Sequence, residues 1–276
     1  MIRLETETEW LLLPHAEHAA LAGEFARHWK NRTFAPPDPF AHVLDAVSRH
    51  DDSWTLRDTS PTLTADGHPA AFSRELVGTY DAFEDIDLAA YLGVRGEATA
   101  SAARRDPYSA ILISMHTVNL LTEQADLSGL DPASRALHGQ FIDGQRRRQQ
   151  ELTARLRCER PELAPFLEPA ALQRGFRFLQ ACDSFSLLAG VDFPQRAALR
   201  HPQPRLDGSE TEIAWIPLGE GCVRLDPWPL DEPALTFDIP YRHIPKSAMR
   251  DLQCFQAAYA AAPVTPRRLL VTGEMP

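Results

Sequence analysis

The stretch DPFAHVLDAVSRHDD, residues 38–52, combines a clear helical pattern with the densest polar group in the chain. Asp38 before Pro39 is typical of a helix start, because Asp caps free N–H groups and proline lacks an N–H. The predicted helix covers about Pro39 to Asp51, and its apolar stripe consists of Phe40, Val43, Leu44 and Val47. His50 and Asp51 follow three and four residues after this stripe, so they fall on its buried face or at its edge. A buried carboxylate is costly unless it is paired or bound to a metal. The alternative is an exposed pair at a helix end.

Two more polar residues lie on the apolar stripes of other predicted helices. His18 belongs to a helix expected over about His15 to Trp29, and Asp183 to one expected over about Pro169 to Gly190. Each residue alone is more often a hydrogen-bonded core residue than a ligand. Imidazole and carboxylate groups on three core-facing helices are, however, what a divalent metal site needs. We therefore predict a site for one or two divalent ions (Mn, Fe, Mg or Zn), with the ligands His18, His50, Asp51 and Asp183.

His116 is a fifth candidate. Its segment, YSAILISMHTVNLL, is apolar nearly all round, which predicts a deeply buried helix. A buried histidine needs a partner for both ring nitrogens. His116 could bind a second metal, could act as a general acid or base near the first, or could make a structural hydrogen bond.

Helical patterns dominate the first two thirds of the chain, and short alternating strands follow His201. Further helices are expected over about Ile86 to Arg105, Pro107 to Gln124, Pro132 to Glu159 and Lys246 to Ala261. Strands are expected over Glu212 to Ile216, Cys222 to Leu225, Ala234 to Ile239 and Arg268 to Thr272, with a hairpin over Ile2 to Leu13. We therefore expect a mostly α protein with one domain over residues 1–276. Its helical core would cover about 14–200, and a β-rich extension about 201–276. The N-terminal hairpin and the C-terminal strands would form a small β appendage.

Composition and motifs exclude several classes of protein. The net charge of −10 argues against a surface for duplex DNA or anionic membranes. No apolar run reaches the roughly 18 residues of a spanning helix, and the acidic N-terminus does not resemble a signal peptide. We expect a cytoplasmic protein with four reduced cysteines. No nucleophile elbow, P-loop or dinucleotide-binding glycine motif is present.

The order of the predicted ligands is similar to that of the HD superfamily of metal-dependent phosphohydrolases, which is named for its His-Asp doublet. More closely, the chain resembles a bacterial domain-of-unknown-function family, number three-eight-nine-one. The matching stretches are HAALAGEFARHW from His18, HDDSW from His50, Asp58 with Pro61, DPYSAILISMH ending at His116, DSFSL from Asp183 and DPWPL from Asp226. The HD resemblance implies an HD-like helical bundle as the core of the domain.

The HD resemblance also gives roles to residues beside the doublet. Asp52 stands where many HD proteins carry an apolar residue, and it would act as a base or support a metal ligand. Trp54 would line the pocket. Arg49 and Arg57 are placed at the substrate only by their proximity to the doublet. The long irregular segment from Asp52 to Pro69 is expected to fold over the site, because loops of this length are uncommon unless they are functional or disordered.

Three functions fit these features. The first is a metal-dependent hydrolase acting on a phosphate ester or anhydride of a small molecule, with Asp52 or His116 moving protons. The second is an HD-fold di-iron oxygenase, in which His116, and less readily His138, would add ligands. The third is a non-catalytic sensor or structural protein that kept the fold. We expect a small-molecule substrate and no nucleic-acid or membrane partner, and a homo-oligomer is compatible with the sequence.

Overall fold

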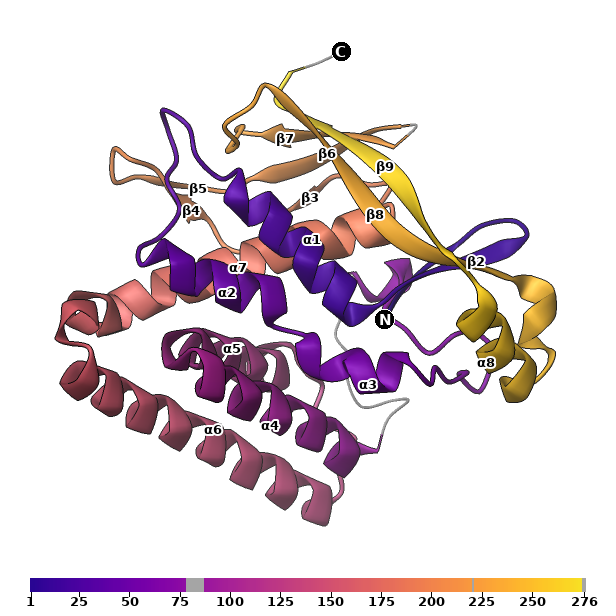
Figure 1. Cartoon of the computed structure of the whole chain (residues 1–276), viewed down its shortest axis with the longest axis horizontal. Coiled ribbons are helices and arrows are strands. Elements are labelled where there is room, and N and C mark those ends of the chain that lie inside the picture. Colours follow the sequence, from indigo (N-terminus) through magenta and orange to yellow (C-terminus); the bar gives the residue numbers. More distant parts are fainter. Residues whose placement is uncertain (78–86, 220, 275–276) are drawn as a thin grey trace.

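The fold is organised around a seven-stranded mixed sheet (Figure 1). The computed structural model describes residues 1–77, 87–219 and 221–274. The sheet has the strand order β1 (Ile2–Glu5), β2 (Glu9–Leu13), β8 (Ala234–Pro245), β9 (Val264–Thr272), β7 (Cys222–Asp226), β6 (Ala214–Gly219) and β3 (Ala197–Ala198). Only the pairing of β7 with β9 is parallel among these described strands. A separate two-stranded sheet contains β4 (Gln203–Pro204) and β5 (Glu210–Thr211).

Strand β8 joins the two ends of the chain into one sheet. Its residues Phe237, Ile239 and Tyr241 are buried and alternate with more exposed neighbours, as in a strand packed on one face. On one side β8 pairs with β9, and on the other it pairs with β2, where Trp10 lies opposite Ile244. The hairpin of β1 and β2 is therefore an edge of the main sheet.

The expectation of a mostly α, HD-like bundle with a small β appendage is wrong, because this sheet makes the protein an α/β fold. Two prolines explain why the strands β8 and β9 were predicted to be shorter than they are. The predicted strands ended before Pro240 and began after Pro266, since proline cannot donate to a ladder. In the sheet these two prolines lie opposite each other, so the missing N–H groups fall at one point of a long pairing.

Most of the predicted helices are present in the structure. Their bounds are α1 (His15–Arg27), α2 (Phe40–Arg49), α3 (Thr55–Asp58), α4 (Leu88–Arg105), α5 (Pro107–Asn119), α6 (Pro132–Glu159), α7 (Pro169–Gly190) and α8 (Leu252–Ala261). Ile86, the expected start of α4, lies outside the described residues. No described helix has the length and apolar character needed to cross a membrane.

Three helices that carry predicted ligands are held in close contact. The ring of Phe25 on α1 stacks on Phe185 of α7, with centroids 3.9 Å apart, and both rings contact Phe237 of the sheet. Gly23 on α1 faces Ser48 on α2, where a Cβ atom would overlap the serine hydroxyl. This glycine lets α1 approach α2 closely, and so brings their polar residues together.

Candidate metal centre

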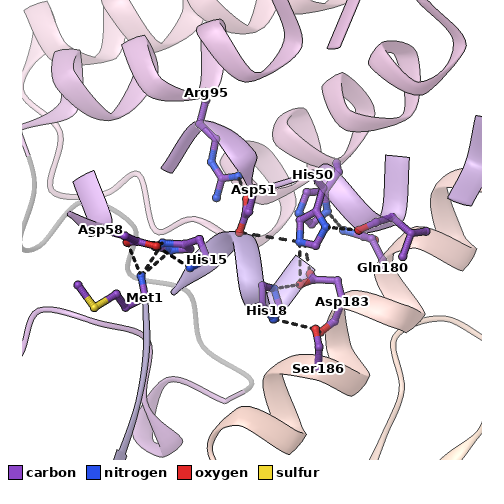
Figure 2. A network of polar contacts seen from close by, with 12 residues as sticks. Met1, His15, His18, His50, Asp51, Asp58, Arg95, Gln180, Asp183 and Ser186 are labelled. Carbon is purple, nitrogen blue, oxygen red and sulfur yellow. Dashed lines mark hydrogen bonds and ion pairs between the residues drawn. The ribbon is translucent and has the colours of Figure 1, made fainter. Parts of the chain in front are cut away.

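His50 follows the last residue of α2 and turns its ring nitrogen Nε2 toward the carboxylates of Asp51 and Asp183 (Figure 2). Its Nδ1 lies 2.8 Å from the carbonyl of Val47, so Nδ1 donates its proton there. Its buried Nε2 has no hydrogen-bond partner among the described residues. This nitrogen lies 3.4 Å from Asp183 Oδ1 and 3.8 Å from Asp51 Oδ2. A lone pair that faces two carboxylates requires a cation between them.

In the metal-free protein a proton takes that place. Burial opposes a charge on His50, but the carboxylates of Asp51 and Asp183 outweigh it and raise the pKa of His50 to about 9. A metal ion bound to Nε2 must displace this proton, because the same lone pair holds both.

The Nε2 of His18 on α1 also faces a carboxylate. Its Nδ1 lies 2.7 Å from Ser186 Oγ, and the Ser186 hydroxyl donates to the carbonyl of Asp183. Because a hydroxyl has one proton, Ser186 accepts from His18 Nδ1–H, and Nε2 is directed at Asp183. That Nε2 lies 2.9 Å from Asp183 Oδ1. Nε2 and Oδ1 are therefore placed so that one metal ion could bind both.

Both carboxylates of the cluster are ionised. Burial raises the pKa of Asp183, but its contacts with His18 and His50 hold the pKa well below the ordinary value. Asp51 is buried too, and Arg95 on α4 is the largest influence that lowers its pKa. The Arg95 guanidinium donates to Asp51 Oδ1 at 2.7 Å, while Oδ2 faces His50. Asp51 therefore divides its two oxygens between a buried cation and the centre of the cluster.

His116 on α5 completes the cluster. Its Nε2 lies 3.9 Å from Asp183 Oδ2, and burial lowers its pKa to about 3. Two overlapping groups of buried residues have ligand atoms within 4.8 Å of one another: His18, His50 and Asp51, and His50, His116 and Asp183. Metal–ligand bonds of about 2.0–2.3 Å place neighbouring ligand atoms about 3–3.5 Å apart. The cluster is close to that spacing and could hold a metal ion.

A cavity of about 130 Å³ opens beside the cluster. Its polar lining includes His15, His18, Asp51, Arg95, His116, Gln124, Asp183 and Arg200, and its apolar lining includes Ile2, Phe72, Leu76, Val77, Leu120, Leu187 and Leu188. The guanidinium of Arg95 lies against the rings of Trp54 and Tyr91, at 5.1 and 5.5 Å. Trp54 is buried and does not line the cavity itself. Its ring lies behind two lining residues, Arg95 and His15, and stacks on the His15 ring at 4.9 Å. One cavity is thus lined by residues of the cluster, by arginine side chains and by apolar side chains.

The structure does not bring Asp52 and Arg49 to this cavity. They pair with each other at 3.5 Å, are 42% and 51% exposed, and line a separate hollow on α1 and α2. Arg57 lies over the Trp54 ring at 5.7 Å and is not part of the cavity lining. The Nε2 of His138 contacts the carbonyl of Leu121 instead of the cluster.

Arg95 was not predicted from the sequence, although a signal was present. Leu88, Tyr91, Leu92, Ala98 and Ala102 form the buried stripe of α4, and Arg95 occupies a position of that stripe. An arginine at a core position needs a buried partner, which Asp51 provides.

His15 and Asp58 form a second pair that the sequence did not reveal. The ring Nδ1 of His15 lies 2.9 Å from Asp58 Oδ1. Burial raises the pKa of Asp58, but the neighbouring His15 outweighs it and lowers the pKa to about 2. The nitrogen of Met1 contacts both residues (Figure 2). No pattern in the sequence joins these residues, which come from three separate segments.

Comparison with known proteins supports the nearer of the two resemblances. The model of a family described as a protein of unknown function, DUF3891, matches residues 1–246. No curated protein and no solved structure gives a significant match. The resemblance to the HD superfamily therefore stays a prediction.

Proposed function

We propose that this chain, which belongs to the DUF3891 family of proteins of unknown function, is a metal-dependent hydrolase of a small phosphate ester or anhydride. The ligands would be His18, His50, Asp51 and Asp183. A divalent metal there supplies a bound water of lowered pKa and neutralises charge on phosphoryl oxygens. The order of these four residues along the chain, similar to that of the HD superfamily, supports phosphoryl chemistry.

The Nε2 of His50, which has no hydrogen-bond partner among the described residues, carries the proposal. A structural histidine in a core normally has partners for both ring nitrogens. A metal-binding histidine typically donates one N–H to a carbonyl and keeps the other nitrogen for the metal. His50 has the second arrangement, with the Val47 carbonyl on one side and two carboxylates on the other.

The cavity supplies the cations that an anionic substrate needs. Arg95 and Arg200 both line it, and guanidinium groups match the geometry of phosphate oxygens. Arg95 is held by Asp51 and by the aromatic rings beside it, so its position does not have to be fixed when substrate binds. These two arginines take the role that the sequence assigned to Arg49 and Arg57.

One observation favours a di-iron oxygenase as a second candidate. His50, His116 and Asp183 form a second group of potential ligands, which would suit a second ion. His50 belongs to both groups, however, and it has one free lone pair. It can bind one ion at a time, so two ions would have to share Asp183.

Elemental analysis together with phosphatase assays tests the proposal. Purified protein should hold close to one divalent ion per chain and should hydrolyse aryl phosphates or diphosphates with Mn²⁺, Fe²⁺, Mg²⁺ or Zn²⁺. His50→Gln should lose the ion and the activity. His138→Gln, a matched buried histidine away from the cluster, should keep both. Two irons per chain would favour the oxygenase, and wild-type protein that binds no divalent metal would overturn both candidates.

A further inference from the structure

His116 differs from the other two histidines of the cluster in what its Nδ1 meets. The Nδ1 atoms of His18 and His50 face acceptors, Ser186 Oγ and the Val47 carbonyl. The Nδ1 of His116 instead faces a donor, the side-chain amide nitrogen of Gln180, at 3.5 Å. A ring nitrogen that faces an N–H group must be unprotonated.

The orientation of the Gln180 amide follows from its other contacts. Gln180 is fully buried on α7, and its Oε1 contacts Nε2 of His201. Its amide nitrogen donates to Asn119 Oδ1 at 2.7 Å. The same Asn119 oxygen accepts from Gln124 Nε2, also at 2.7 Å. The Gln180 amide therefore turns its oxygen toward His201 and its nitrogen toward Asn119. The second N–H group of the amide nitrogen is then directed at His116.

We propose that Gln180 is a positioning residue that fixes His116 with its proton on Nε2, so that His116 donates a hydrogen bond into the cavity and is not a metal ligand. A neutral imidazole has one N–H, and a donor at Nδ1 places it on Nε2. That Nε2 lies on the side of Asp183 Oδ2, and His116 lines the cavity.

This assignment divides the three histidines by role. His18 and His50 turn lone pairs toward the carboxylates, and His116 turns an N–H toward the space that a substrate would fill. An N–H at that place suits an oxygen that gains negative charge during hydrolysis. This catalytic role rests on the proposed function, whereas the tautomer of His116 does not.

Nitrogen-15 NMR of the histidine rings in metal-free, full-length protein tests the tautomer directly, because protonated and bare ring nitrogens resonate far apart. The signals of His116 are identified by their loss in His116→Gln. In wild type the proton should be on Nε2. In Gln180→Glu the new carboxylate can only accept, so the proton should move to Nδ1. Gln145→Glu is the matched control, because Gln145 is also buried but its side chain bonds Ser114 and Thr99 instead of the His116 ring. It should leave the His116 signals unchanged.

The same variants separate positioning from simple damage to the fold. Gln180→Glu frees the His116 lone pair, so it should bind added metal more tightly or take up a second ion, while activity falls by about 100-fold or more. A wild-type His116 with its proton on Nδ1 would overturn the inference, even if no Gln180 variant folds. If the tautomer is as stated but wild-type protein binds no metal, the proposed hydrolase fails and the tautomer assignment stands.

Discussion

Asp51 and Arg95 form a buried ion pair, with Oδ1 of the aspartate 2.7 Å from a guanidinium nitrogen. From the sequence, metal binding and pairing with a buried cation were alternatives for Asp51. In the structure one oxygen of Asp51 pairs with the cation and the other faces His50. The carboxylate can thus remain buried and charged with or without a metal ion.

Replacing Asp51 should therefore have two effects. Asp51→Asn leaves Arg95 buried without its carboxylate, which should lower the free energy of unfolding of the metal-free protein by about 3–5 kcal/mol. The rise in melting temperature on adding Mn²⁺ or Fe²⁺ should disappear. Asp45→Asn is the control, because Asp45 forms a partly exposed pair with Arg105; it should cost at most about 1 kcal/mol and keep the metal response. Thermal melts with chelator and with metal measure both effects. A variant that still gains stability from metal would remove Asp51 from the ligand set.

Replacing Arg95 should lower the free energy of unfolding less when metal is bound than when it is absent. Arg95→Met leaves Asp51 unpaired, so the metal-free protein should lose about 3–5 kcal/mol of stability. Bound metal would compensate the carboxylate, and the loss should then be smaller. In the active enzyme, KM for a phosphate substrate should rise. Denaturant titrations at zero and saturating metal compare the two states. An equal loss in both states would show that the ion does not contact Asp51.

The raised pKa of His50 predicts how stability changes with pH. A group whose folded-state pKa rises from 6.5 to about 9 stabilises the fold below pH 6.5, and this contribution is lost as pH rises to 9. The metal-free protein should lose on the order of 3 kcal/mol over this range. Saturating metal should abolish this loss of stability at higher pH, because the metal ion replaces the proton on His50 Nε2. His50→Gln should show a flatter profile than wild type, and identical profiles would contradict the assignment.

Ser186 should affect metal binding by orienting the His18 ring. Ser186→Ala removes the acceptor that orients the His18 ring, so metal affinity should fall by about 10- to 100-fold. Ser114→Ala removes another buried hydroxyl, which bonds Gln145, and should leave metal affinity unchanged. Competition with a fluorescent chelator gives both values. Equal affinities for wild type and Ser186→Ala would mean that Ser186 does not orient a ligand.

Helical periodicity was enough to select the residues of the cluster. His18, His50 and Asp183 each lie on or beside an apolar stripe, and burial of such stripes against one another brings the polar groups together. Arg49 and Asp52 show that closeness in sequence to the His-Asp doublet is not enough to place a side chain at the site. They flank the doublet in sequence, but their side chains pair with each other at the surface, away from the cluster.

The sheet could not be predicted in the same way. Strand pairing depends on partners far away in the sequence, and a period of two residues does not name the partner. Gln180 was equally hidden, since its role depends on contacts with His201, Asn119 and His116 from other segments. Such contacts appear only when the elements are placed in space.

The pairing of β2 with β8 also determines when the strand edge that precedes α1 can be completed during synthesis. Trp10 lies opposite Ile244, so this edge of the sheet cannot close until almost the whole chain has left the ribosome. Contacts of such long range also slow folding, because a large loop must be closed first. Helix α1, which carries His18, begins two residues after β2 ends, so this end of the helix is anchored late. Tight metal binding would then mark a chain whose folding is complete, and a nascent chain would hold its future ligands apart.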